Sequence, residues 1–306
     1  MEERLRKFVR LVEAGNFVRA AHELHISQPA LSAAIAKLER ELHTPLLLHG
    51  VRPLTLTPAG ELAYVAGKDL QVRTNNLQTQ LAELGNRRLT VSIGMIDSVA
   101  EVLFGSAGSI ANLERQAAVS LVVDNSRNLL QATQKGALDV AFVVAQPAYD
   151  GVLEIMQRST EPLFLVCHPA GLESTNQAIA QGLLPKFISY DQASTTHRLV
   201  LGALARHGLS PQPTFYSTSP EAMLQLVLLQ KGAAVLPYVQ VRGLLADGSL
   251  VLAGHEPLLV ERPIRAIKRR DRILPSPLTR TVREITTQLH AIQAVAQFVS
   301  GKTLSK

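Results

Sequence analysis

The sequence predicts a chain of class α + α/β, in which a helical N-terminal segment is joined through one long helix to an α/β remainder. Three observations support this prediction. Residues 17–42 contain two short runs with the apolar spacing of a helix, and one uninterrupted helical pattern follows Thr57. From Leu89 onward, short apolar runs alternate with helical ones, which indicates βαβ units and a parallel sheet.

The first expected helix covers residues 4–14, where an apolar residue recurs every three or four positions. Gly15 follows as its stop, because glycine adopts the left-handed conformation that ends many helices. A second helix begins at Phe17. Its apolar residues fall on one face: Phe17, Ala20, Ala21 and Leu24.

The third helix begins after Ser27, whose hydroxyl can accept a hydrogen bond from a free N–H of the first turn. Pro29 fits that turn, because its missing N–H costs nothing there. The expected buried face consists of Leu31, Ile35, Leu38 and Leu42. The opposite face carries small residues and a few hydrogen-bond donors, so another surface can approach it closely, as DNA approaches a recognition helix. A helical hairpin without a ligand is the alternative.

A short hairpin is expected over residues 43–57, with Gly50 near its tip. Beside a helix-turn-helix, such a hairpin forms a wing along the phosphate backbone, and Arg52 is the residue that we assign to this contact. Phosphate contacts fix the register of a protein on DNA, while base contacts select the sequence.

The long helix is capped by Thr57 and extends to about Leu84. Apolar residues recur in it every seven positions: Ala63, Leu70, Leu77 and Leu84, with Leu81 beside them. A narrow apolar stripe on a polar helix predicts pairing with a second copy of the chain, which also provides two DNA half-sites. Packing of the stripe on its own domain is the alternative.

Residues Ala20–Glu61 resemble the N-terminal signature of the LysR-type transcriptional regulators. The hexad Ser27–Ser32 and the segment Leu56–Gly60 match at the separation found in that family. Ala33-Ala34 depart from the family, which often has arginine or a long polar residue there, and His49 stands in place of the usual arginine. The resemblance implies a winged helix-turn-helix that binds double-stranded DNA. Its DNA-binding residues are then Ser27, Gln28, Pro29, Ser32, Ala33, Lys37, His49 and Arg52.

The α/β remainder divides into two units. The expected strands cover residues 89–94, 118–123, 139–144, 163–168, 186–190, 214–217, 233–237 and 260–267. The expected helices cover residues 98–114, 126–135, 195–207, 220–231 and 276–298. Two units predict two lobes with a cleft, and ligands of open sheets bind beyond the C-terminal ends of the strands. Gly136–Val140 and Val227–Pro237 also resemble segments of the LysR effector domain, which is similar to type II periplasmic binding proteins.

We therefore expect three domains. They are a winged helix-turn-helix over residues 1–58, a linker and dimerisation helix over residues 59–87, and an effector-binding domain over residues 88–306. Within the last, lobe I takes about 88–162 and 267–306, and lobe II takes about 163–266.

Four polar turns lie at the expected C-terminal ends of strands, each before a helix. Their residues are Asp97 and Ser98; Asn125 and Ser126; Ser194, Thr195 and Thr196; and Thr218 and Ser219. Hydroxyls and free N–H groups at helix starts bind anions, so these turns predict a small-molecule effector, a carboxylate being one candidate. Each turn by itself is better explained as a helix cap, and a site is expected from the convergence of all four. Asp97 opposes a purely anionic ligand, so either His197 and Arg198 offset it or the ligand carries an amine.

The chain is basic, with a formal charge of +6 and a pI of about 9.6, which suits a polyanionic partner. Residues 1–60 contribute little to this charge, with eight Lys or Arg against six Glu. The densest basic run is Arg262–Arg272. For residues 268–272 we favour a solvated edge or a subunit interface over a second nucleic-acid contact.

Other features bound the compartment and the chemistry. No apolar run approaches the length that spans a membrane, and the charged start lacks the apolar region of a signal peptide. The single Cys167 lies in an apolar run, which excludes a disulfide framework and predicts a buried thiol in the cytoplasm. His22 and His25 miss the metalloprotease spacing by one residue, and Gly105–Gly108 misses a nucleophile elbow by one. We expect no enzyme, no metal and no cofactor.

The sequence thus predicts a cytoplasmic LysR-type transcriptional regulator, a homodimer or homotetramer, that binds DNA and responds to a small molecule held between two lobes. No membrane partner is expected. The alternatives are a cytoplasmic solute-binding protein and an α/β enzyme with a helical appendage.

Overall fold

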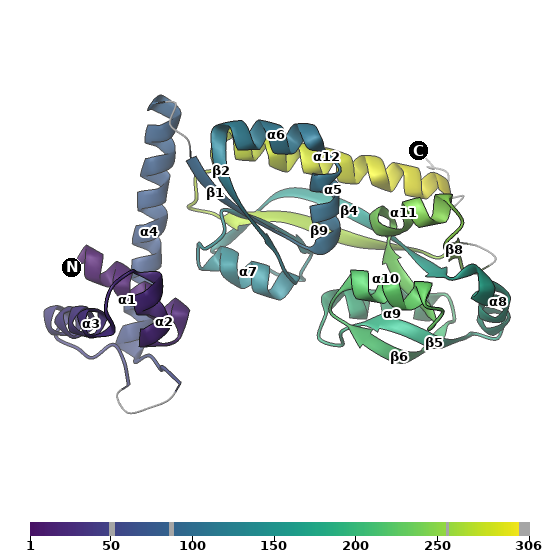
Figure 1. Ribbon diagram of the computed structural model, residues 1–306, viewed down its shortest axis with the longest axis horizontal. Helices are drawn as coiled ribbons and strands as arrows, with labels where there is room; N and C mark the ends of the chain where they lie inside the picture. Colours follow the sequence, from purple (N-terminus) through teal and green to yellow (C-terminus); the bar gives the residue numbers. More distant parts are fainter. Residues whose placement is uncertain (49–52, 86–88, 255–256, 300–306) are drawn as a thin grey trace. The chain divides into compact units, whose positions relative to one another are not determined.

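The computed structural model describes residues 1–48, 53–85, 89–254 and 257–299 (Figure 1). The described residues form two compact units. One is Met1–Gly85 with Asp271–Ile273, and the other holds the remaining described residues. Within these ranges, no helix combines the length and the apolar character needed to cross a membrane.

Three short helices build the core of the N-terminal unit: α1 (Glu2–Ala14), α2 (Phe17–Glu23) and α3 (Gln28–Leu42). Gly15 ends α1 in the left-handed conformation, with φ 74°, as predicted. Ser27 caps α3 by accepting a hydrogen bond from the Ala30 N–H at 3.3 Å, which confirms the predicted start of this helix. The predicted inner face of α3 is buried at Leu31, Ile35 and Leu38, while Leu42 is half-buried.

The long helix α4 (Pro58–Gly85) starts at its predicted cap, where the Thr57 hydroxyl accepts a hydrogen bond from the Gly60 N–H at 3.0 Å. Helix α1 packs so closely on α4 at Gly67 that a Cβ at this position would lie only 2.5 Å from Val9 Cγ2. The stripe leucines remain uncovered within one chain. Leu70, Leu77, Leu81 and Leu84 are 43%, 56%, 55% and 86% exposed.

A single mixed sheet organises the second unit, in the order β2-β1-β3-β9-β4-β7-β5-β6, with β8 paired to β4. Its strands are β1 (Leu89–Met95), β2 (Ala117–Val123), β3 (Val140–Val144), β4 (Leu153–Cys167), β5 (Leu183–Tyr190), β6 (Ser210–Ser217), β7 (Ala233–Pro237), β8 (Val251–Leu252) and β9 (Leu259–Arg269). Its helices are α5 (Asp97–Phe104), α6 (Ala107–Gln116), α7 (Ser126–Gln134), α8 (Leu172–Ala180), α9 (Thr195–Arg206), α10 (Pro220–Leu228), α11 (Tyr238–Ala246) and α12 (Ser276–Val299), with a 3-10 turn at Pro169–Gly171.

Two long antiparallel strands, β4 and β9, pass through both lobes. Their pairing begins with Leu153 opposite Arg269 in lobe I and ends with Phe164 opposite Leu259 in lobe II. In lobe I, β1 pairs in parallel with β2 and β3, and in lobe II β5 pairs in parallel with β6 and β7. Figure 1 shows α6 and α12 along one side of the lobe I sheet and α7 on the other. Each lobe has its own apolar core.

The structure corrects several expected elements. The helix expected over residues 98–114 is two helices, because the backbone leaves the helical conformation at Ser106. The strand expected from Leu163 begins ten residues earlier, at Leu153. Its first half contains polar residues, mostly at half-buried positions, so it lacks the apolar run that predicts a strand. Helices α8 and α11, of nine residues each, were not predicted.

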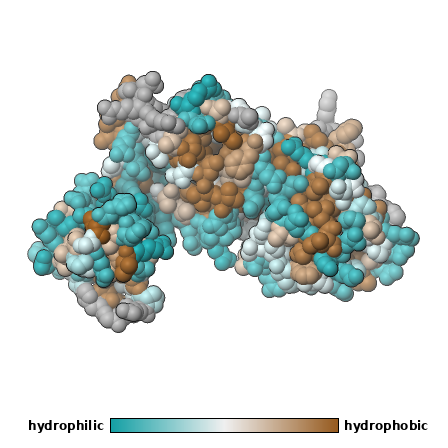
Figure 2. All heavy atoms as spheres, viewed as in Figure 1, coloured by the Kyte–Doolittle hydropathy of each residue, from teal (hydrophilic) through white to brown (hydrophobic). Residues whose placement is uncertain are grey.

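The edge strand β2 leaves an apolar surface on lobe I. Leu121, Val122 and Val123 are each more than a third exposed, and Phe104 at the end of α5 is 55% exposed. Figure 2 shows apolar side chains gathered in this region of the unit. An uncovered edge strand with apolar side chains is a ready surface for pairing with another chain.

Candidate functional site

Helix α3 presents an exposed face of small and polar residues. Ser27, Gln28, Pro29, Ser32, Ala33 and Lys37, all predicted to contact DNA, are exposed. The face also includes Ala36 and Arg40. It carries short side chains near the helix N-terminus and two cations, Lys37 and Arg40, in the C-terminal half, and none of these residues belongs to the domain core. Such a surface fits the width of a major groove.

The predicted wing is formed at its base. Leu47 and Leu56 make an antiparallel bridge, and the Leu48 N–H donates to the Thr55 carbonyl at 2.9 Å. The Glu39 carboxylate of α3 accepts hydrogen bonds from the N–H groups of Leu46 and Leu47 at 2.7 and 3.2 Å, which fixes the hairpin to the helix. The predicted phosphate contacts His49 and Arg52 lie outside the described residues.

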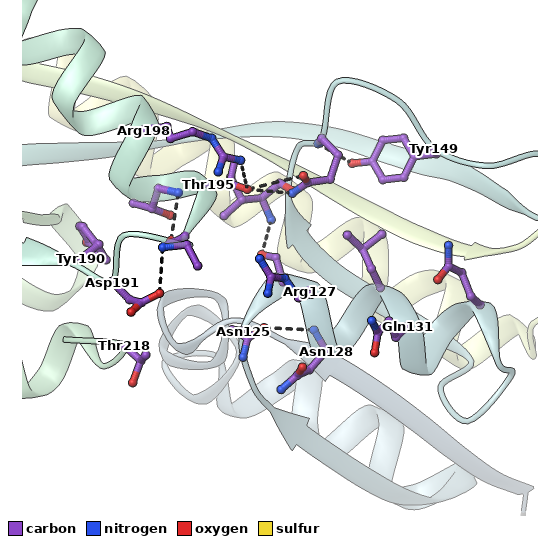
Figure 3. Close-up of a pocket in the computed structure, with 18 of the residues that line it drawn as sticks. Asn125, Arg127, Asn128, Gln131, Tyr149, Tyr190, Asp191, Thr195, Arg198 and Thr218 are labelled. Atoms are coloured by element: carbon purple, nitrogen blue, oxygen red, sulfur yellow. Dashed lines mark hydrogen bonds between the residues drawn. The ribbon is translucent and has the colours of Figure 1, made fainter. Parts of the chain in front are cut away.

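A pocket of about 460 Å³ lies between the two lobes (Figure 3). Its lobe I wall consists of the face of α7 that carries Arg127 and Gln131, together with the segment after β3. Its lobe II wall consists of the start of α9 and the turn after β6. This volume falls in the range of small-molecule sites, and the two walls come from the C-terminal ends of strands, as expected for an open α/β sheet.

Six of the nine predicted effector residues line this pocket. They are Asn125, Ser126, Ser194, Thr195, Thr196 and Thr218. Several of these side chains also have structural roles, because Asn125 and Ser194 cap α7 and α9, and the Ser126 hydroxyl accepts a hydrogen bond from the Val144 N–H at 3.0 Å. The pocket therefore presents their remaining donors and acceptors to a ligand.

The other three predicted residues, Asp97, Ser98 and Ser219, do not line the pocket. Ser98 is buried, and its hydroxyl accepts a hydrogen bond from Arg262 Nη2 at 2.9 Å. Ser219 caps α10 by accepting a hydrogen bond from the Ala222 N–H at 3.2 Å. Asp97 lies in the first turn of α5.

The sequence did not predict most of the pocket's longer side chains. On lobe I these are Arg127, Asn128, Gln131, Gln134, Gln146, Tyr149 and Asp150, and on lobe II they are Tyr190, Asp191 and Arg198. The helical spacing of residues 127, 131 and 134 on α7 indicates one polar face, and this pattern was available in the sequence. From the sequence, Arg198 is expected only to offset the charge of Asp97.

A direct side-chain contact crosses the cleft beside the pocket. Gln146 Nε2, on the segment after β3, donates to Thr195 Oγ1 at the start of α9 over 3.2 Å. Gln146 Nε2 also donates to the Val144 carbonyl at 3.1 Å, and the backbone N–H of Gln146 donates to the Tyr149 hydroxyl at 3.2 Å. Figure 3 shows Thr195 beside the Arg198 side chain. The bond holds the two lobes together beside the pocket.

A buried ion pair forms a second link between the lobes. Arg262 on β9 donates through Nε to Glu161 Oε2 on β4 at 2.9 Å, and both residues are at least 97% buried. Arg262 Nη2 reaches Ser98 on lobe I, and Arg262 Nη1 donates to Thr196 Oγ1 on lobe II at 3.3 Å. Burial alone would lower the pKa of Arg262. The charges of Glu161, Tyr190 and Asp97 and the hydrogen bond to Glu161 together outweigh this effect, so the pKa lies above its ordinary value.

Tyr190 lies between this ion pair and the pocket. Burial raises the pKa of its hydroxyl, and the charges of Arg262 and Glu161 act on it. The hydroxyl is buried and has no hydrogen-bond partner among the described residues, and neither has Glu161 Oε1. A buried donor without a partner is costly, and Tyr190 lines the pocket, so its hydroxyl marks a place where a polar ligand atom gains a hydrogen bond.

Most cations of the basic run Arg262–Arg272 have partners within the fold. Arg262 and Arg269 are buried, and Arg269 Nη1 donates to the Gln134 carbonyl at 2.8 Å. Lys268 pairs with Glu154 at 2.6 Å. Arg272, which belongs to the N-terminal unit, donates to Asn76 Oδ1 at 2.8 Å and to Thr79 Oγ1 at 3.3 Å. Over residues 268–272, the burial of Arg269 and Arg272 contradicts the expected solvated edge, and the other expectation, a subunit interface, stays a prediction.

The predicted burial of Cys167 is confirmed. Its side chain is 2% exposed on β4, in the lobe II core, and burial raises the pKa of its thiol.

Comparison with known proteins identifies matching families for both units. Residues 3–61 match the bacterial regulatory helix-turn-helix protein, lysR family. Residues 84–290 match the LysR substrate binding domain. The chain is 30% identical over 242 residues to a probable cat1 operon transcriptional activator of Acinetobacter lwoffii, which covers 76% of this chain and 78% of that protein.

Solved structures share the fold along nearly the whole chain. A full-length OxyR variant from Pseudomonas aeruginosa has a TM-score of 0.66 and 18% identity, and the match covers 100% of this chain and 98% of that one. Full-length LysG from Corynebacterium glutamicum, with its effector arginine bound, has a TM-score of 0.62 and 17% identity, with 95% and 98% covered.

Proposed function

The chain belongs to the LysR family of bacterial transcriptional regulators, and from this premise we propose how its own residues bind DNA and effector. Family membership decides against the solute-binding alternative. Its relatives are regulators of transcription, so we also propose that the chain has no enzymatic activity and acts in the cytoplasm.

The recognition surface is the exposed face of α3. Gln28, Pro29 and Ser32 face base edges, with the Gln28 amide donating to and accepting from adenine and the Pro29 ring touching a thymine methyl. Ser27 and Ala33 flank them, and Lys37 contacts phosphate together with His49 and Arg52. The observation that carries this proposal is that every described member of the set is exposed while the other face of α3 is buried.

The domain boundaries follow from the same assignment. Residues 1–58 bind DNA, residues 59–87 link and dimerise, and residues 88–306 bind the effector, with lobes I and II divided as predicted from the sequence. Two copies join through the exposed leucines of α4, since uncovered Leu77, Leu81 and Leu84 on one helix favour a partner helix. The apolar edge at β2 provides a second surface, which allows a homodimer to extend to a homotetramer.

The effector binds in the pocket between the lobes. Thr195 accepts a hydrogen bond from Gln146 of lobe I, and Thr196 accepts one from Arg262, which also binds Ser98 of lobe I. An effector that contacts Thr195 and Thr196 therefore touches residues that already connect the two lobes. A ligand that prefers one arrangement of the lobes therefore changes the population of that arrangement and, through it, the affinity for DNA.

A direct test measures binding of the full chain to duplexes from the region upstream of its own gene, by fluorescence anisotropy over a range of salt concentrations. We expect a salt-sensitive affinity and a preferred fragment. Gln28→Ala should reduce the preference for that fragment over unrelated duplex by about tenfold, while leaving nonspecific binding unchanged. Arg283→Gln, an exposed change on α12, is the control. Equal sequence discrimination by Gln28→Ala and the unaltered protein would refute the assignment of base contacts.

A further inference from the structure

The pocket between the lobes has a charge pattern that defines the class of its ligand, and this inference rests on the proposed function. Two guanidinium groups lie in it, one from each lobe. Arg127 belongs to the first turn of α7 and Arg198 to the first turn of α9. Figure 3 shows both side chains beside the pocket, in the neighbourhood of Thr195.

Both guanidinium groups have unused donors. Arg127 is exposed and makes no side-chain hydrogen bond or ion pair with any described residue. With the described residues, the Arg198 guanidinium makes one long hydrogen bond, from Nη2 to Thr195 Oγ1 at 3.4 Å. Each also lies at a helix start, where N–H groups favour negative charge. An anionic group between the lobes gains charge-assisted hydrogen bonds from both sides.

The two carboxylates of the pocket are already engaged. Asp191 Oδ1 accepts a hydrogen bond from the Ala193 N–H at 3.0 Å. Asp150 accepts one from Gln134 Nε2 at 2.6 Å and one from the Val152 N–H at 3.3 Å. Neither carboxylate forms an ion pair with Arg127 or Arg198 in the described part of the chain, so both guanidinium groups stay available to a ligand.

The remaining free groups are neutral and polar. The Gln131 amide and the Thr218 hydroxyl have no side-chain partner among the described residues, and the Tyr190 hydroxyl is buried without one. Together they offer donors and acceptors spread along the pocket. Apolar side chains are in the minority, chiefly Leu130, Val144 and Leu153. A flat aromatic ligand would leave these polar groups without partners, at a cost for each.

We propose that the effector is a small organic anion that carries several hydroxyl groups, with its anionic group held between Arg127 and Arg198 and its hydroxyls bonded to Gln131, Thr218 and Tyr190. A carboxylate and a phosphate share this chemistry. Lobe closure around such a ligand brings one arginine from each lobe onto the same charge, which ties binding to the arrangement of the lobes.

The test is isothermal titration calorimetry of the full chain with four probes: gluconate, glucose 6-phosphate, glucose and benzoate. We expect saturable binding of gluconate or of glucose 6-phosphate, whichever anion fits, with glucose at least about tenfold weaker because it lacks the charge. Arg127→Gln and Arg198→Gln should each weaken the binding of that anion about tenfold, and Arg283→Gln, an exposed arginine outside the pocket, should not.

Binding of gluconate alone assigns a carboxylate, and binding of glucose 6-phosphate alone assigns a phosphate. Three results overturn the proposal. They are stronger binding of benzoate than of gluconate and glucose 6-phosphate, no binding of either of these two anions, and an affinity of Arg127→Gln and Arg198→Gln for the anion equal to that of the unaltered protein. DNA binding of each variant is measured in parallel. Retained sequence-specific DNA binding with no anion binding overturns this inference alone, whereas anion binding without DNA binding overturns the proposed function and leaves the ligand class intact.

Discussion

Replacing Arg262 by methionine should destabilise the second unit strongly. The change leaves the Glu161 carboxylate buried at 1% exposure without its cation, and it also removes the donors to Ser98 and Thr196. Removing one partner of a buried ion pair costs about 3–5 kcal/mol. This is a large fraction of the roughly 5–15 kcal/mol that stabilises a typical domain, and it corresponds to a decrease in melting temperature of about 10 °C.

The assay is urea unfolding followed by circular dichroism at 222 nm, since the chain has no tryptophan to report on tertiary structure. A double-mutant cycle with Glu161→Leu separates the pair interaction from the loss of each side chain. The double variant Glu161→Leu with Arg262→Met should be more stable than Arg262→Met alone, because no buried charge is left without a partner. Arg283→Met, the same change at an exposed position of α12, should alter the free energy of unfolding by less than about 0.5 kcal/mol.

Two results would refute this reasoning. A loss of less than about 1 kcal/mol for Arg262→Met would mean that Glu161 reaches solvent or takes up a proton at little cost. A double variant with the summed destabilisation of the two single variants would mean that the pair does not interact.

Three further predictions concern titration, assembly and reactivity. Burial raises the pKa of Glu101 above 4.5, and the charges of Glu221, Glu161 and Asp97 add to the effect. The folded state therefore holds this proton more tightly than the unfolded state, and stability falls as the pH rises from about 4.5 through the raised pKa. Glu101→Gln should flatten the pH dependence of the unfolding free energy over that range and raise this free energy at pH 7, and an unchanged pH profile would count against the prediction. Leu77→Asp with Leu81→Asp should convert the oligomer to a smaller species in native mass spectrometry, because both side chains are more than half exposed in one chain; an unchanged mass would exclude α4 from the interface. Cys167 should react with 5,5′-dithiobis(2-nitrobenzoate) only in denaturant, since it is buried and its pKa is raised; rapid reaction of the folded protein would contradict its burial.

The N-terminal unit was predictable because its determinants are local. The cap at Ser27, the stop at Gly15 and the apolar spacing of α3 all act within one or two helical turns, and the structure confirms each of them. The same holds for the start of α4 at Thr57. A motif of short range in the sequence is also short in space, so propensity and pattern suffice to place it.

For the α/β unit, the sequence predicts the alternation of strands and helices correctly but misses the bounds of several elements. The sequence pattern predicts one helix where the structure has α5 and α6. It does not predict the first half of β4, because polar residues on a strand that crosses between lobes break the apolar pattern. The sequence placed four polar turns at strand ends, and the structure brings residues from three of them to one pocket. The fourth turn, at Ser98, binds Arg262 instead.

By itself, the sequence determined the helix-turn-helix, the long helix, the two-lobed α/β class and the family resemblance, since all of these follow from spacing along the chain. The tertiary structure alone decided which side chains meet. Arg262 and Glu161 are 101 residues apart and face each other only because β4 and β9 pair in one register, with Glu161 opposite Arg262. The two arginines of the pocket likewise come together through strand order, which no local pattern encodes, because register and crossover are set by the packing of both lobes on the same pair of strands.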